Sequence, residues 1–167
     1  MKPPERKEPA QFNQGPIDGV IVRDLRMHSD HRGWVMELYR QDEMAESDFP
    51  VMAYLSETLC GVTRGPHEHL YQTDYFAFFG PGEFTLHMWD IRAESPSWGN
   101  YSRMTFGPEK KQTVLVPPGV VHAYENTGDI PAWVLNAPNR LYAGPGKSEE
   151  VDEIRHEDRA DSPYRMN

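Results

Sequence analysis

Two short segments of this chain carry histidines at a spacing that could support chemistry. The first contains His67 and His69, and the second, much later, contains His122 just after a Pro-Pro-Gly turn. Because side chains alternate between the two faces of an extended strand, His67 and His69 should point the same way, and His122 could complete a cluster. Three imidazoles that converge inside a β-structure predict either a metal site or a general acid–base site.

The carboxylate of Asp74 strengthens the metal alternative. With His67, His69 and His122 it would form a site of three histidines and one carboxylate, suited to Zn²⁺, Fe²⁺, Mn²⁺ or Ni²⁺. An imidazole bound to a metal through its free lone pair cannot also accept a proton, so the two roles of His67 exclude each other. A simpler role for Asp74, as a carboxylate at a strand start that accepts backbone hydrogen bonds, agrees equally well with the sequence.

The elements that must position these residues are short strands separated by turns. Ten candidate strands cover residues 19–25, 33–39, 51–59, 63–68, 74–79, 83–90, 100–106, 113–116, 122–126 and 132–137. In one of them Phe84, Leu86 and Met88 alternate with polar or amphipathic residues, as in a strand with one face in the core. Many short strands at near-even spacing predict an all-β sandwich or barrel, with residues 41–47 as a short helical turn.

Length and composition limit the organisation of the protein. The 167 residues suffice for one domain, and we expect a flexible N-terminal arm over residues 1–15 followed by a single domain over residues 16–167. The acidic tail at residues 149–158 should form a short helix or an edge strand.

Charge and cysteine usage restrict the partners and the compartment. With 26 acidic and 17 basic residues and a formal charge of -9, the surface should repel nucleic acid and anionic membranes, which leaves a small molecule as the expected partner. The single cysteine, Cys60, rules out an internal disulfide, and its apolar neighbours suggest that it packs in the interior. No apolar run is long enough for a bilayer span or a signal peptide, so we expect a cytoplasmic protein.

The two histidine segments resemble the two signature motifs of the cupin superfamily. The first reads Gly-x5-His-x-His-x4-Asp from Gly61 to Asp74, and the second reads Pro-x-Gly-x-x-His-x-x-x-Asn from Pro117 to Asn126. The superfamily usually has a glutamate where Asp74 stands. This resemblance implies a cupin-type jelly-roll β-barrel, also called a double-stranded β-helix.

More of the chain resembles one branch of that superfamily, the dTDP-4-dehydrorhamnose 3,5-epimerase family. Residues 30–37 resemble its Asp-x-Arg-Gly-x-x-x-Glu motif, residues 61–67 its Gly-Val-x-Arg-Gly-x-His motif, and residues 90–99 its Asp-x-Arg-x-x-Ser-Pro-x-x-Gly motif. The resemblance implies a homodimeric 3,5-epimerase, or a related sugar isomerase, in polysaccharide biosynthesis. Its substrate would be a nucleotide sugar of the dTDP-4-keto-6-deoxyhexose type, and it would need no cofactor.

The family resemblance also implies roles for individual residues. The histidine at the position of His67 is the base, and a tyrosine on a late strand, matched here by Tyr142, is the acid. A base on one face and an acid on the other suit this reaction because the protons at C3 and C5 of a 4-keto sugar are acidic. Arg64 is expected to approach the diphosphate or the sugar carbonyl, since a guanidinium can fork onto phosphate oxygens.

Three further residues complete the expected substrate site. His122 belongs to it through the second motif, and Arg32 and Glu37 match residues that in the family reach the nucleotide from the neighbouring subunit. The family also has a carboxylate that orients the base, in a C-terminal segment where Asp158 and Asp161 are the candidates here.

Two departures from the family pattern keep other functions open. The family usually has a glutamine where His69 stands, and a lysine that assists the enolate where Asp74 stands. Because both changes supply metal ligands, a divalent metal remains an alternative cofactor. The alternatives to the epimerase are therefore a metal-dependent cupin enzyme, such as a dioxygenase or lyase acting on a small acid, and a non-catalytic sugar-binding cupin.

Overall fold

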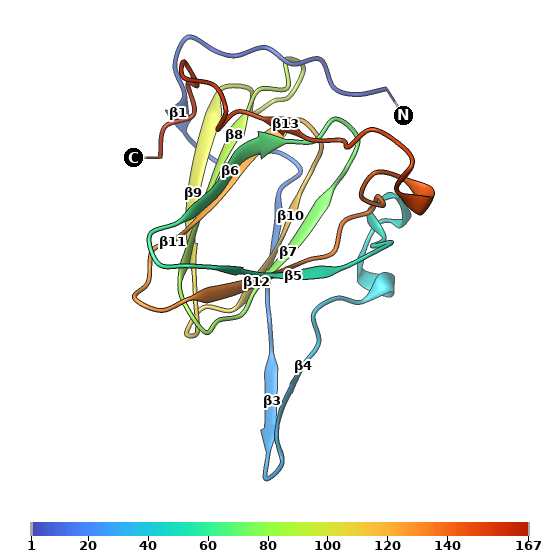
Figure 1. The fold of residues 1–167 in the computed structure, drawn as a ribbon, viewed down its shortest axis with the longest axis vertical. Helices are drawn as coiled ribbons and strands as arrows, with labels where there is room; N and C mark the ends of the chain where they lie inside the picture. Colours follow the sequence, from blue (N-terminus) through green and yellow to red (C-terminus); the bar gives the residue numbers. More distant parts are fainter. Residues whose placement is uncertain (1, 167) are drawn as a thin grey trace.

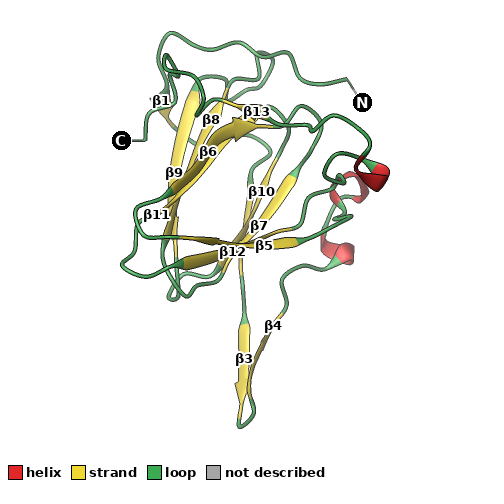
Figure 2. Ribbon diagram, viewed as in Figure 1, coloured by secondary structure: helices red, strands yellow, loops and turns green. Residues whose placement is uncertain are grey.

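The computed structural model describes residues 2–166, and its regular secondary structure is almost entirely β-strand (Figures 1 and 2). One sheet has six strands, in the order β1-β9-β8-β11-β6-β13, and a second sheet has five, in the order β2-β10-β7-β12-β5. The strands of the first sheet are β1 (Asn13–Gln14), β6 (Thr63–Glu68), β8 (Phe84–Asp90), β9 (Asn100–Phe106), β11 (Val120–Asn126) and β13 (Ile154–Arg155). Those of the second are β2 (Ile21–Asp24), β5 (Tyr54–Thr58), β7 (Asp74–Phe78), β10 (Gln112–Val116) and β12 (Ala132–Asn136). The two sheets form the predicted jelly-roll barrel.

The main core lies between the two sheets. Phe84, Leu86 and Met88 of β8 point into it, which confirms the alternation seen in the sequence, and they pack against residues of β7, β10, β11 and β12. Trp89, on the other face of β8, belongs to a second apolar cluster with Tyr164. The central strand β8 of the six-stranded sheet is therefore buried on both of its faces.

The N-terminal segment and the C-terminal tail cover the outer face of the six-stranded sheet. The guanidinium of Arg6 donates to the Oε1 atom of Glu68 over 3.0 Å, and Nε2 of His156 lies 3.0 Å from the same oxygen. The ring of Phe12 lies 5.8 Å from that of Tyr164, and β1 pairs in parallel with β9. The flexible arm was predicted over residues 1–15, but residues 2–15 pack on their own domain, because buried groups on the outer sheet face provide partners for them.

A hairpin formed by β3 (Met27–Asp30) and β4 (Gly33–Met36) extends away from both sheets (Figure 1). Its apolar residues are exposed: Trp34 keeps 59% and Val35 72% of its accessible surface. At the tip, Arg32 donates to the Asp30 carboxylate. A hairpin with this much uncovered apolar surface is typical of an interaction element.

Short segments outside the sheets follow the sequence prediction in part. Residues 41–47 were predicted to be helical, and 3₁₀ turns occur at Gln41–Glu43 and Glu46–Asp48. For the tail, predicted to form a short helix or an edge strand, the structure shows the edge strand β13. The prediction for Cys60 was wrong, since it is exposed in the turn between β5 and β6. A third 3₁₀ turn lies at Pro145–Lys147. Within residues 2–166, no helical segment is long enough to cross a membrane.

Candidate active site

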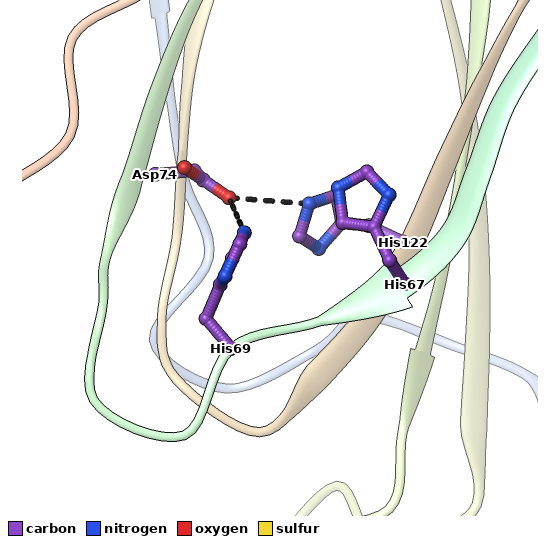
Figure 3. Close-up of side chains that lie close together, drawn as sticks. All are labelled: His67, His69, Asp74 and His122. Atoms are coloured by element: carbon purple, nitrogen blue, oxygen red, sulfur yellow. Dashed lines mark ion pairs between the residues drawn. The ribbon is translucent and has the colours of Figure 1, made fainter. Parts of the chain in front are cut away.

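The predicted histidine and carboxylate cluster forms at one end of the barrel. His67 lies on β6 and is the register partner of His122 on the neighbouring strand β11. His69 follows β6 directly, whereas Asp74 begins β7 in the opposite sheet. One ligand atom from each of the four residues lies within 4.8 Å of the others (Figure 3). The cluster therefore joins the two sheets where β6, β7 and β11 come together.

Asp74 is at the centre of this cluster and is almost fully buried, with 1% exposure. Its Oδ1 atom accepts hydrogen bonds from the side-chain amides of Gln72 and Asn136, each over 2.8 Å. Its Oδ2 atom lies 3.1 Å from Nε2 of His69 and 3.2 Å from Nε2 of His122. Burial favours the neutral carboxyl, but the two histidines outweigh burial and hold the pKa of Asp74 well below its usual value.

The histidines respond differently to these surroundings. Burial opposes protonation of His69, but the Asp74 carboxylate and the Asp152 carbonyl outweigh it and raise the pKa of His69 to about 9. Burial, together with the neighbouring rings of His122 and His69, lowers the pKa of His67 well below its usual value. A neutral His67 has a lone pair with which it can accept a proton.

A carboxylate faces His67, but it is not one of the predicted residues. The Oε1 atom of Glu153 lies 3.9 Å from Nδ1 of His67, and Arg155 holds the other carboxylate oxygen over 3.2 Å. Asp161 is instead exposed, with 82% of its side-chain surface accessible, and pairs with Arg159. The sequence missed Glu153 because only the pairing of β13 with β6, which sets Arg155 opposite His67, brings it here.

A cavity of about 740 Å³ opens beside His67. This volume is typical of sites that bind small molecules. Arg64 lines it and is held by two hydrogen bonds, from Nε to the Thr58 hydroxyl over 3.0 Å and from Nη2 to the Glu57 carbonyl over 2.8 Å. Arg140, Lys147 and Arg155 also line the cavity, as do five acidic side chains: Glu149, Glu150, Asp152, Glu153 and Glu157. The cavity thus combines a histidine with charged side chains of both signs, among which Arg64 is held in place as a cation that could contact an anionic group.

Three tyrosines line the same cavity: Tyr54, Tyr124 and Tyr142. Tyr142, the predicted acid, is 56% exposed, so its hydroxyl is accessible to a ligand. The Tyr54 hydroxyl accepts a hydrogen bond from Asn136 over 2.9 Å, and burial raises the pKa of Tyr54 to about 12. Sequence reasoning did not single out Tyr54, which lies on β5 outside both histidine motifs.

The remaining predicted residues lie apart from the cavity or beneath it. Arg32 and Glu37 belong to the projecting hairpin and its base, so this chain does not bring them to its own His67. His122 is only 1% exposed and lies behind His67, with ring centroids 4.5 Å apart. Its Nδ1 atom is 3.0 Å from the Val120 carbonyl.

Comparison with known proteins assigns this chain to a family. The model of the family described as dTDP-4-dehydrorhamnose 3,5-epimerase matches residues 14–150. This chain belongs to that family. A probable low-salt glycan biosynthesis epimerase of Haloferax volcanii is 35% identical over 127 residues, covering 75% of this chain and 81% of the relative. The spore coat polysaccharide biosynthesis protein SpsL of Bacillus subtilis is 34% identical over 119 residues, covering 71% and 78%.

Solved structures share the fold. A dTDP sugar isomerase of Desulfovibrio desulfuricans superposes with a TM-score of 0.75 at 26% identity, over 89% of this chain and 88% of that one. A 3,5-epimerase of Legionella pneumophila, solved with dTDP-4-keto-L-rhamnose, has a TM-score of 0.71 at 22% identity and covers 85% and 74%. The family's jelly roll is therefore the fold of this chain.

Proposed function

We propose that this enzyme is a 3,5-epimerase of a nucleotide-activated 4-keto-6-deoxyhexose. One observation carries the proposal: a base and an acid of the types that the reaction needs, His67 and Tyr142, line one cavity together with the fixed cation Arg64. The family membership supports it, as do the names of the relatives, which act in glycan and polysaccharide biosynthesis.

In the proposed reaction, His67 removes the proton next to the keto group. Glu153 faces Nδ1, so it favours the tautomer with hydrogen on Nδ1 and a lone pair on Nε2. The electron pair of the broken C–H bond forms a C=C bond, and the carbonyl π electrons move to oxygen. Tyr142 then donates a proton to the same carbon from the opposite face, which inverts that centre, and solvent restores both residues. The steps are proton transfers without net oxidation, so no redox cofactor takes part.

The nucleotide part of the substrate would be held by cations. Arg64 is anchored by hydrogen bonds to Thr58 and Glu57, which supports a role for it in binding the diphosphate. A guanidinium at such a position can form two hydrogen bonds with phosphate oxygens. Lys147 and Arg155 line the same cavity and would neutralise further negative charge.

We further propose that the active unit is a homodimer. The projecting hairpin exposes Trp34 and Val35, and it carries Arg32, which has no place in its own cavity. A second copy of the chain would cover this apolar surface and could receive Arg32 and Glu37 at its nucleotide site. A cytoplasmic location, where nucleotide sugars would be available to such an enzyme, remains part of the proposal.

Isotope exchange tests this function directly. The enzyme is incubated in D₂O with the 4-keto-6-deoxyhexoses of dTDP, UDP, GDP and CDP, and deuterium at C3 and C5 is followed by NMR and mass spectrometry. We expect exchange at both carbons, with inverted products, for one nucleotide series. Binding of these sugars without exchange would instead identify a sugar-binding protein. The absence of both binding and exchange would contradict the assignment of substrate class.

A further inference from the structure

Two histidines of the cluster are held in one tautomer by backbone carbonyls. Nδ1 of His122 lies 3.0 Å from the Val120 carbonyl, and Nδ1 of His69 contacts the Asp152 carbonyl. A carbonyl oxygen can only accept a hydrogen bond, so both Nδ1 atoms must carry the hydrogen. Without a second proton, each Nε2 atom presents a lone pair; in the metal-free protein the raised pKa of His69 keeps a proton on its Nε2 atom, and a bound cation would replace that proton.

Both Nε2 atoms are directed at the same anionic oxygen. Figure 3 shows the rings of His69 and His122 turned toward Oδ2 of Asp74, at 3.1 and 3.2 Å. The other carboxylate oxygen, Oδ1, already accepts two amide hydrogen bonds. Within the described residues, Oδ2 of Asp74 and Nε2 of His122 have no hydrogen-bond partner although both are buried. Buried polar atoms without a partner are rare and costly, so a positive group between these atoms is the simplest way to satisfy them.

We propose that Nε2 of His69, Nε2 of His122 and Oδ2 of Asp74 bind a divalent transition-metal ion. Metal bonds of about 2.1 Å separate neighbouring ligand atoms by about 3.0 Å in octahedral and about 3.4 Å in tetrahedral geometry, which brackets the two distances here. Metal-bound imidazoles commonly donate their other N–H to a carbonyl, as both rings do. Two nitrogens and one oxygen suit Zn²⁺, Fe²⁺, Mn²⁺, Co²⁺ or Ni²⁺ better than Mg²⁺ or Ca²⁺, which prefer oxygen ligands.

This three-ligand site leaves His67 free to act as the base. His69 lines the cavity beside His67, so the open coordination positions would face the substrate. Resting on the proposed function, the metal would polarise the keto oxygen and stabilise the negative charge that forms there when His67 takes the proton. The ion would thus supply the positive charge that a lysine provides in relatives that have one at the position of Asp74.

Metal analysis tests the binding site. The full chain is purified without chelators, and part of it is stripped with EDTA and dialysed against Co²⁺ or Zn²⁺. We expect about one equivalent of metal in the purified or reloaded protein, and a Co²⁺ visible spectrum that marks nitrogen and oxygen ligation. Less than roughly a tenth of an equivalent in both preparations would overturn the proposal.

Variants distinguish three ligands from four. His122→Asn and Asp74→Asn should lose the metal and the Co²⁺ spectrum, whereas His67→Asn should keep both. His31→Asn, an exposed histidine at the hairpin tip, is the matched control. Circular dichroism verifies that each variant is folded. Addition of Co²⁺ should raise the melting temperatures of the parent and of His67→Asn, but not those of His122→Asn and Asp74→Asn. Loss of metal from His67→Asn would overturn the three-ligand assignment.

Deuterium exchange separates this inference from the proposed function. We expect the stripped enzyme to exchange substrate protons at least tenfold more slowly than the metal-loaded enzyme, which corresponds to loss of one electrostatic contact to the enolate. Full exchange by the stripped enzyme would leave the epimerase standing and overturn the catalytic role of the metal. A metal-loaded protein that exchanges with none of the sugars would overturn the epimerase, although the metal site would stand.

Discussion

The Glu153 carboxylate faces the ring of His67, with Oε1 of Glu153 and Nδ1 of His67 3.9 Å apart. This spacing is longer than a hydrogen bond in the free enzyme, and such contacts commonly shorten when a substrate binds. The pairing of β13 with β6 fixes it, and Arg155 holds the carboxylate in place. Glu153 is thus a positioning residue for the proposed base rather than a group that contacts the substrate.

Glu153→Gln should slow proton abstraction because the amide cannot stabilise the imidazolium that forms on His67. We expect kcat to fall roughly tenfold to a hundredfold with little change in KM, as for other groups that orient a functional histidine. Glu153→Asp should recover part of the loss, and the pH profile of kcat should shift in Glu153→Gln alone. Glu109→Gln, an exposed glutamate in the β9–β10 turn, is the control. An unchanged kcat would remove Glu153 from the mechanism.

His67→Asn should abolish exchange because the base itself is lost. The expected decrease in rate is on the order of a hundredfold or more, the usual contribution of general base catalysis. Nucleotide-sugar binding, followed by thermal shift, should persist because Arg64 and Lys147 remain. Near-normal turnover by His67→Asn would show that another group removes the proton.

Tyr142→Phe should separate exchange from inversion. His67 would still remove the proton and solvent deuterium would still return, but it would return to the same face. We therefore expect deuterium in the substrate with at least tenfold less inverted product than the parent forms. Tyr54→Phe is the matched comparison, since Tyr54 lines the same cavity. If Tyr54→Phe alone loses inversion, Tyr54 is the acid.

Strand spacing predicted an all-β sandwich or barrel, the resemblance of two motifs to the cupin superfamily implied the jelly roll, and the spacing of the histidines predicted their cluster. Strand alternation fixes which face each side chain occupies, and the turn residues around Gly119 fix where β11 begins. Glu153 and Tyr54 were missed because their proximity to His67 results from pairing between distant strands. The packing of residues 2–15 was missed for the same reason: Glu68 and the outer face of β8 create the surface that the N-terminal segment covers.

Gly65→Ala should disturb the base through the backbone. Gly65 has a φ of +85°, and a Cβ there would lie 2.6 Å from the His122 carbonyl oxygen and 3.0 Å from Nδ1 of His67. We expect a loss of about 2 kcal/mol or more in stability, together with loss of turnover. Gly61→Ala is the control, because its φ is +69° but nothing lies within 4 Å of an added Cβ. A smaller effect at Gly65 than at Gly61 would contradict the proposed close packing around His67.

Val35→Asp should weaken the proposed dimer. Val35 is the most exposed of the apolar hairpin residues, and a charge there would be costly to bury against a second copy. Analytical ultracentrifugation should show the parent as a dimer and Val35→Asp shifted toward monomer, with reduced nucleotide-sugar binding. Arg32→Ala should remain dimeric but raise KM. Ile130→Ser, an exposed residue outside the hairpin, is the control. A monomeric parent with full turnover would contradict the dimer.

The motif at residues 90–99 has a structural explanation that leads to a pH prediction. Asp90 is fully buried and accepts hydrogen bonds from Nε of Arg92 over 2.8 Å and from the hydroxyls of Ser95 and Ser97, each over 2.6 Å. Burial opposes ionisation, but these three partners outweigh it and lower the pKa of Asp90 below its usual value.

The pKa of Asp90 is lower in the folded protein than in the unfolded chain, where it is about 4, so ionised Asp90 stabilises the fold fully at pH values above about 4. That stabilisation is lost as the pH falls through the lower pKa of the folded state. Asp90→Asn should therefore lose stability at neutral pH, by roughly 1 to 3 kcal/mol for the broken network, and should show a flatter dependence of unfolding free energy on pH between about 5 and 2. Urea unfolding at a series of pH values measures both effects. Asp129→Asn, an exposed turn residue, is the control and should follow the parent. An Asp90→Asn curve parallel to that of the parent would show that Asp90 is not an acid-sensitive group of this fold.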